Sequence, residues 1–91
     1  MYSVAIEDYL KSLWKLGPKD VGTQELASHL DVKPASVTKM VLRLTEMGLV
    51  DHTPYKGASL TRQGELEALS VVLPAVLIKA SAFRDEAFRR V

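Results

Sequence analysis

Residues 23–47 read TQELASHLDVKPASVTKMVLRLTEM and contain two helical patterns joined by a short turn. Thr23 is a good N-cap for the first helix, whose apolar residues share one side: Leu26, Ala27 and Leu30. The second helix begins at Pro34 and ends before Gly48, and its apolar residues also share one side: Val37, Met40, Val41, Leu44 and Met47. Two helices connected through residues 31–33 form a helix-turn-helix, in which the second helix enters the major groove of DNA.

The residues after Gly48 change from helical to extended character. Residues 49–55 are expected to form an edge strand, Lys56-Gly57 a turn, and residues 58–60 a return strand. Because two strands alone are not stable in water, this hairpin must pack against the helices. The predicted fold class is therefore mainly α with a small β-hairpin, a winged helix-turn-helix followed by a C-terminal helical segment.

Two further helices are expected on either side of this motif. The first runs from near Ser3 to Gly17-Pro18, and its apolar residues form one stripe: Ile6, Tyr9, Leu10, Leu13 and Trp14. The second is capped by Thr61 and continues to about Leu73, and Pro74 should then kink or break it.

An apolar stripe continues past this proline, with spacings that alternate between three and four residues: Leu66, Leu69, Leu73, Val76, Ala80, Phe83 and Ala87. Such a stripe is either buried in the chain's own core or forms a contact between two copies, and its extent favours the dimer. We therefore expect a winged helix-turn-helix DNA-binding domain over residues 1–63 and linker or dimerisation helices over residues 64–91.

The composition limits the classes of protein to which the chain can belong. Its 91 residues suffice for one small domain, and without Cys it has no disulfide framework, thiolate nucleophile or cysteine zinc site. The N-terminus lacks a signal-peptide pattern, and the longest uncharged stretch, residues 68–78, is too short to cross a membrane. A cytoplasmic protein with no membrane partner is expected.

The sequence offers little for catalysis. His29 and His52 are the two histidines, and neither has a second ligand at the spacing of helical metal sites apart from Glu25, four residues before His29. There is no Ser/His/Asp motif, Gly-rich phosphate loop or pair of carboxylates on an apolar face. We expect His29 on the surface, and a protein that is not an enzyme.

The net charge of +1 is unevenly distributed along the chain. Residues 32–63 carry five basic and two acidic side chains, a local net charge of +3, whereas residues 1–31 carry −2 and residues 64–91 are neutral. The basic third coincides with the second helix of the motif and the hairpin, which favours a nucleic-acid partner.

The side of that second helix opposite its apolar stripe has its short and basic side chains toward the N-terminal half. Its residues are Ala35, Thr38, Lys39, Leu42, Arg43 and Glu46. Small residues at 35 and 36 allow close approach to DNA. Thr38 can bond a base edge or a phosphate, and Lys39 can reach the acceptors of guanine. Arg43 can hold a phosphate, whereas Glu46 should point away.

Two other positions are candidates for contacts with the DNA backbone. Lys33 lies beside the exposed N–H groups at a helix N-terminus, which is a ready phosphate site. Tyr55 and Lys56, near Gly57 on the hairpin, are placed to touch the backbone or the minor groove. The alternatives are a solvated helix face and a plain hairpin turn.

Several segments resemble the N-terminal half of the DtxR/MntR metal-dependent repressors, and the manganese-responsive branch is the most similar. These segments are Ile6-Glu7-Asp8-Tyr9-Leu10, Leu26-Ala27 through Leu30, Ser36 to Val41, Gly48-Leu49-Val50 and Leu60-Thr61-Arg62-Gln63-Gly64. The resemblance covers about residues 4–72. It implies base and phosphate contacts at Lys33, Ala35, Ser36, Thr38, Lys39 and Arg43, with support from Thr23, Gln24 and Lys56.

The resemblance also implies a divalent metal cofactor, manganese or iron, with Asp8 at a ligand position. The other ligand positions of the family read Lys11, Pro74, Ala75 and Lys79 in this sequence, and an ammonium group repels a divalent cation. The chain ends before the family's further dimerisation helices, which fits either a shortened or diverged regulator that needs no metal or a chain whose end from Leu73 is altered relative to its relatives. Asp8 alternatively suits the first turn of a helix, where an acid is favourable.

Together, these patterns predict a sequence-specific DNA-binding transcriptional regulator, a repressor of the metal-dependent type that binds a palindromic operator as a homodimer through residues after Gly64. Two alternatives remain open. One is a winged-helix module that binds protein, and the other is a DNA-binding regulator that responds to a ligand other than a metal.

Overall fold

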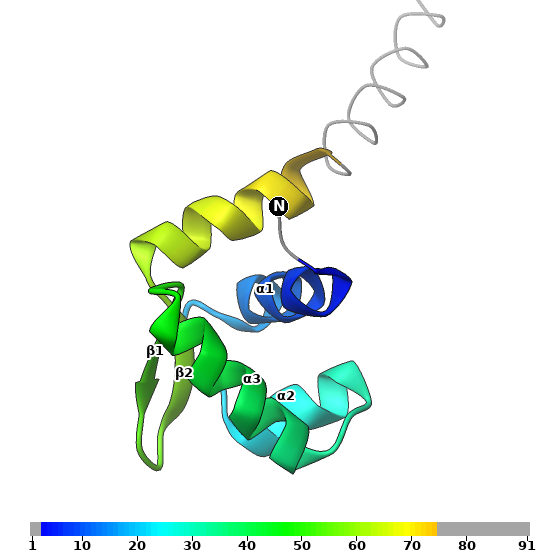
Figure 1. Cartoon of the computed structure of the whole chain (residues 1–91), viewed down its shortest axis with the longest axis vertical. Helices are drawn as coiled ribbons and strands as arrows, with labels where there is room; N and C mark the ends of the chain where they lie inside the picture. Colours follow the sequence, from blue (N-terminus) through cyan, green and yellow to red (C-terminus); the bar gives the residue numbers. More distant parts are fainter. Residues whose placement is uncertain (1–2, 75–91) are drawn as a thin grey trace, which may run out of the picture.

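A two-stranded hairpin lies between two helical parts of the chain (Figure 1). The computed structural model describes residues 3–74. Its elements are α1 (Val4–Leu16), α2 (Thr23–Leu30), α3 (Pro34–Glu46), β1 (Val50–Thr53), β2 (Gly57–Leu60) and a helix over residues 62–74. This order confirms the predicted winged helix-turn-helix. None of the helices within the described residues is long and apolar enough to span a membrane.

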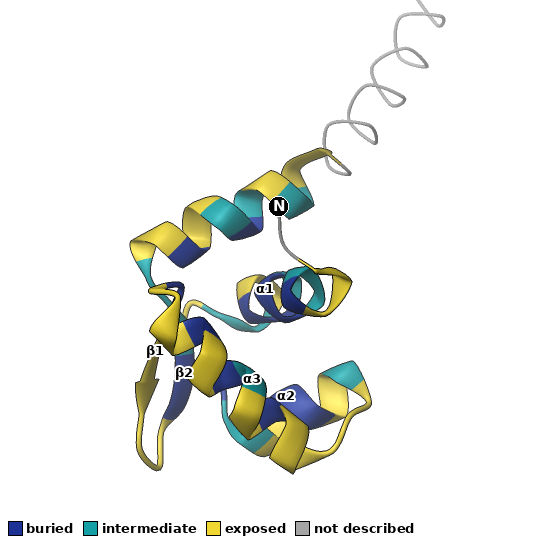
Figure 2. Cartoon of the chain, viewed as in Figure 1, coloured by how far each residue is buried: buried dark blue, intermediate teal, exposed yellow. Residues whose placement is uncertain are grey.

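One hydrophobic core joins all of these elements (Figure 2). Its buried members are Ile6, Tyr9, Leu10, Leu13, Val21, Leu26, Ala27, Val37, Val41, Leu44, Leu49, Val50, Ala58 and Ala68. The helical periodicity in the sequence identified most of these residues because an amphipathic helix buries the side on which its apolar residues recur. Trp14 and Met47 are exceptions, since they lie at the margins of their stripes and keep 39% and 40% of their surface exposed.

The starts of α1 and α3 agree with the sequence, and the start of α2 differs. Ser3 is the N-cap of α1, and its hydroxyl accepts a 3.3 Å hydrogen bond from the N–H of Ile6. The helix α3 begins at Pro34, as predicted. Thr23 is not the N-cap of α2, because that position belongs to Gly22, whose extended backbone starts the helix one residue earlier without a side-chain cap.

The hairpin, or wing, is shorter than predicted. Its strands pair Val50 with Leu60 at one end and Thr53 with Gly57 at the other. The turn occupies residues 54–56, so the predicted turn at Lys56-Gly57 overlaps it only at Lys56 and is wrong at Gly57, which begins β2. Proline fits the second position of a turn and cannot continue the ladder, which explains why β1 ends at Thr53.

A single extended residue from outside the hairpin pairs with the second strand of the wing. Val21 pairs with Ala58 through two backbone hydrogen bonds, of 2.8 Å and 2.9 Å. The backbones of Val21 and Gly57 lie so close together that a Cβ on Gly57 would clash with the carbonyl oxygen of Val21. No sequence pattern indicates this pairing, because one bridging residue has no periodicity.

The helix over residues 62–74 is joined to the wing through Thr61. The Thr61 hydroxyl donates to the Gly48 carbonyl at 2.7 Å and accepts from the Gly64 N–H at 3.0 Å, so the predicted cap is confirmed. Ala68 packs this helix into the core, whereas Leu66 and Leu73 are exposed. The rest of the predicted stripe, Val76 to Ala87, lies outside the described residues.

Candidate nucleic-acid interface

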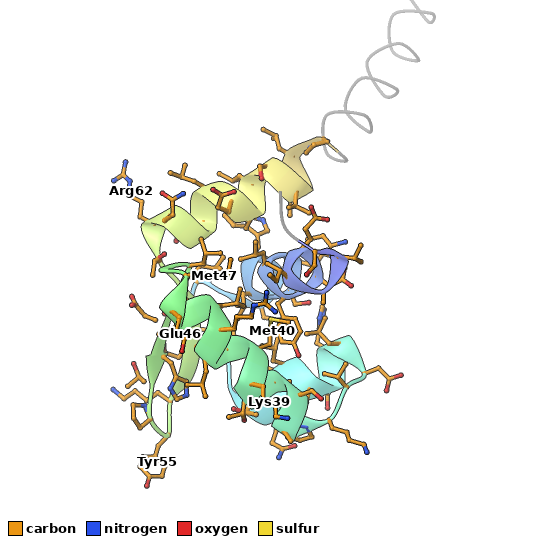
Figure 3. The ribbon with its side chains drawn as sticks, in the orientation of Figure 1. Lys39, Met40, Glu46, Met47, Tyr55 and Arg62 are labelled. Carbon is orange, nitrogen blue, oxygen red and sulfur yellow. The ribbon has the colours of Figure 1, made fainter. Side chains whose placement is uncertain are left out.

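The outward side of α3 is the central feature of the candidate interface. Its inward side buries Val37, Val41 and Leu44, and Met40 packs partly against the same core. Figure 3 shows Met40 toward the interior and Lys39 near the N-terminal end of the helix, away from α1. The exposed residues of α3 are Pro34, Ala35, Ser36, Thr38, Lys39, Leu42, Arg43, Thr45 and Glu46, which include all of the predicted contact positions on this helix.

The turn before α3 presents the start of this helix to solvent. Asp31 ends α2 in the left-handed conformation, with φ of 55°, and the Val32 N–H then donates to the Ala27 carbonyl at 3.0 Å. Lys33 follows as the N-cap of α3, extended and without a side-chain cap. A positive side chain is unfavourable for the helix dipole at this end, but it suits a bound anion.

The hydroxyl of Thr38 is already used inside the helix. It donates to the Pro34 carbonyl at 3.2 Å. Since a phosphate oxygen needs a donor, this geometry favours contact of Thr38 with a base through its remaining acceptor or its methyl group.

The start of α2 lies close to this part of α3. Thr23 and Thr38 line one small cleft, together with residues from α3 and β1. Gln24 is exposed in the first turn of α2, and no side chain caps that helix. The predicted supporting positions in α2 are therefore adjacent to the outward side of α3.

The tip of the wing carries an aromatic side chain in an unusual backbone conformation. Tyr55 is fully exposed and has φ of 67°, a region that few residues other than glycine, asparagine and aspartate adopt. The Lys56 N–H donates to the Thr53 carbonyl at 3.1 Å and closes the turn. In Figure 3, Tyr55 and Lys39 lie toward the same end of the molecule.

The basic side chains of this face have no carboxylate partner within it. The two salt bridges among residues 3–74 join Lys19 to Glu25 at 3.1 Å and Lys11 to Asp8 at 3.5 Å, both elsewhere. Lys33, Lys39, Arg43 and Lys56 are exposed and take part in neither. Their positive charges can therefore act on an anionic partner.

Two residues of this region, Leu42 and His52, were not among the predicted DNA contacts. Leu42 is exposed on the outward side of α3, and His52 lies on β1 beside it, lining the same cleft. Periodicity placed Leu42 on this side, but an apolar residue was not counted among the contacts. His29, in contrast, lies in α2, is exposed as expected, and its Nδ1 is 3.0 Å from the hydroxyl of Ser12.

Among residues 3–74, Asp8 belongs to no group of side chains that could hold a divalent metal. The carboxylate pairs with the ammonium of Lys11, which a metal would have to displace. Within residues 3–74, no three His, Asp or Glu side chains come together as ligands. We therefore assign no step to a metal in this part of the chain.

Three comparisons identify similar proteins. An uncharacterized HTH-type transcriptional regulator of Methanocaldococcus jannaschii is 38% identical over 73 residues, which cover 77% of this chain and 58% of the relative. The HTH-type transcriptional regulator MntR of Oceanobacillus iheyensis is 34% identical over 67 residues, 71% of this chain and 46% of the relative. The chain thus spans about half the length of these relatives.

A similar structure contains DNA. A MarR family protein of Mycobacterium tuberculosis, solved in complex with DNA, has a TM-score of 0.63 and 26% sequence identity, and the alignment covers 98% of this chain and 72% of that protein.

The model of one protein family covers most of the described residues. The family is described as iron dependent repressor, N-terminal DNA binding domain, and its model matches residues 1–58. This match includes α1, the helix-turn-helix and the first strand of the wing. It confirms the predicted resemblance, and the relatives are named as regulators, not as enzymes. The chain belongs to the iron-dependent repressor family, through its N-terminal DNA-binding domain.

Proposed function

We propose that this chain binds double-stranded DNA with sequence specificity and acts as a transcriptional repressor. The observation that carries the proposal is the outward side of α3, where small residues near the start of the helix are combined with exposed basic side chains that have no carboxylate partner among residues 3–74. The regulators among the relatives and the DNA in the complex of the MarR family protein support this function.

In this proposal α3 lies in the major groove. Lys39 and Thr38 contact base edges, and Ala35 and Ser36 let the helix come close to them. The surrounding contacts hold the phosphate backbone and fix the register of the helix: Lys33, Arg43 and Lys56, with Thr23 and Gln24 at the start of α2 and Tyr55 at the tip of the wing.

The experiment that tests this function is the salt dependence of binding. A duplex is first selected with the wild-type chain from a random-sequence library, and its affinity is then measured by fluorescence anisotropy between 50 mM and 200 mM salt. We expect Lys33→Gln and Lys56→Gln each to weaken binding for all sequences and to lower the slope of log K against log salt by about 0.9, the value for one phosphate contact.

Arg62→Gln is the matched control, because Arg62 lies at the end of the molecule opposite Tyr55 (Figure 3). The slope of this variant should equal that of the wild-type chain. If the wild-type chain showed no salt-dependent binding to any duplex, DNA binding would be excluded and the protein-binding alternative would be favoured.

We also propose that two copies bind together, through residues after Gly64. The exposed Leu66 and Leu73 support this on the described part of the helix over residues 62–74. A twofold axis would place two α3 helices in successive major grooves, about 34 Å apart, so the preferred site should be an inverted repeat.

Sedimentation velocity tests the oligomeric state. The expected mass is twice the 10.1 kDa of the chain, and Leu66→Glu should shift the population toward single copies and weaken binding to the selected duplex. A single copy at the concentrations that saturate DNA, or a selected site without an inverted repeat, would contradict the dimer and leave DNA binding itself standing.

A further inference from the structure

Leu42 is an exposed apolar side chain in the middle of the surface that we assign to DNA. It is 53% exposed. At 100° per residue it lies about 20° from Ala35 and about 60° from Lys39 around the axis of α3. A single exposed leucine is common on protein surfaces, so its exposure alone means little. Its position between groups that would face base edges is what requires an explanation.

Leu42 also forms the edge of a small cleft. The cleft has a volume of about 30 Å³ and is lined by Thr23, Thr38, Val41, Leu42 and His52. It therefore lies between the first residue of α2, two turns of α3 and the strand β1. Its volume suits one small group, such as a methyl group or a single water.

The cleft is largely apolar on the side of α3. Val41 is buried and Leu42 is exposed, and both have purely hydrocarbon side chains. The proton of the Thr38 hydroxyl is engaged by the Pro34 carbonyl, so that Thr38 has a methyl group and acceptor lone pairs left to offer. These three residues favour an apolar group against α3, whereas Thr23 and His52 bring polar side chains to the rest of the lining.

Charge indicates which partner brings that apolar group. The exposed basic residues on and beside the same helix, Lys33, Lys39 and Arg43, attract a polyanion. In the major groove of DNA, thymine is the base that presents a methyl group, on C5. We infer that Leu42 and Thr38 contact the 5-methyl group of a thymine and thereby help to set the sequence preference of the protein. This inference rests on the proposed function.

The test removes the methyl group from the DNA without changing base pairing. Each thymine of the selected duplex is replaced in turn by deoxyuridine, and the dissociation constants are measured. At one thymine in each half-site we expect the wild-type chain to bind the uracil duplex about fourfold more weakly, which corresponds to about 0.8 kcal/mol for one buried methyl group. Leu42→Ala should bind both duplexes equally well.

The matched control is Met47→Ala, which removes another partly exposed apolar side chain next to the end of the same helix. It should retain the fourfold ratio. Circular dichroism of both variants checks that they are folded, as expected for exposed positions.

The possible outcomes separate the inference from the proposed function. If the wild-type chain binds a selected duplex but no thymine shows the ratio, or if Leu42→Ala retains it, the inference is wrong and DNA binding stands. If Leu42→Ala bound the thymine duplex and the uracil duplex more weakly than the wild-type chain by the same factor, the inference would also be wrong, because Leu42 would then contact the sugar-phosphate backbone. If the chain binds no duplex at all, the proposed function itself fails.

Discussion

Replacing Lys39 by alanine is expected to lower the affinity for the selected duplex roughly 5- to 150-fold, since a good contact with a base edge contributes about 1–3 kcal/mol of discrimination. Lys39 is exposed on the outward side of α3, and its ammonium pairs with no carboxylate among residues 3–74. Because this lysine would read a guanine, the variant should also lose the preference for one base pair in each half-site. Repeating the selection from the random library with the variant measures this preference directly.

Lys33→Ala is the control that distinguishes base contacts from phosphate contacts. It removes the same charge at the N-cap of α3, and it should weaken binding to every duplex by a similar factor without changing the selected sequence. If Lys39→Ala selected the same sequence as the wild-type chain, Lys39 would be a backbone contact and the reading of bases would have to come from other residues.

The helices could be predicted because their apolar residues recur with the period of the structure. Val37, Val41 and Leu44 are buried as their spacing requires. At the margins of a stripe, however, burial depends on what lies opposite. Trp14 and Met47 have the right spacing but remain partly exposed, since the neighbouring elements do not cover them completely.

The net charge of each third of the sequence indicated the basic region but did not show which basic side chains share one surface. Counting along the sequence assigned Arg62 to the basic third of the chain, together with the reading helix and the wing. In the structure Arg62 lies at the start of the helix over residues 62–74, at the opposite end from Tyr55 (Figure 3). Local charge in the sequence therefore pointed to α3 and the wing, whereas the fold was needed to show which basic side chains share one surface.

The attachment of the wing could not be predicted from the sequence. A hairpin has a recognisable alternation of residues, but Val21, the single residue that pairs with it, lies 37 positions before Ala58 and has no pattern of its own. The turn was misplaced for a related reason. Lys56-Gly57 has the composition of a turn, yet Gly57 is needed in β2 for its close approach to Val21.

This close approach leads to the prediction with the largest expected effect on stability. Gly57→Ala should lower the free energy of unfolding by roughly 3 kcal/mol or more, from strain at a positive φ and from overpacking, which typically cost about 1–3 kcal/mol each. Gly57 has φ of 122°, and an added Cβ would lie 2.2 Å from the Val21 carbonyl oxygen and 2.9 Å from the Gly22 nitrogen. Thermal unfolding should show a Tm lower by roughly 15 °C or more for a domain of this size.

Gly48→Ala separates the two causes of that loss. Gly48 also has a positive φ, of 75°, but an added Cβ would meet no atom within 4 Å. Its replacement should therefore cost only the backbone strain, about 1 kcal/mol. The difference between the two variants reports the cost of the close approach to Val21 together with the greater backbone strain at the φ of Gly57. If Gly57→Ala cost no more than Gly48→Ala, the wing would not be paired with Val21 as described, and the placement of Tyr55 and Lys56 beside α3 would lose its structural basis.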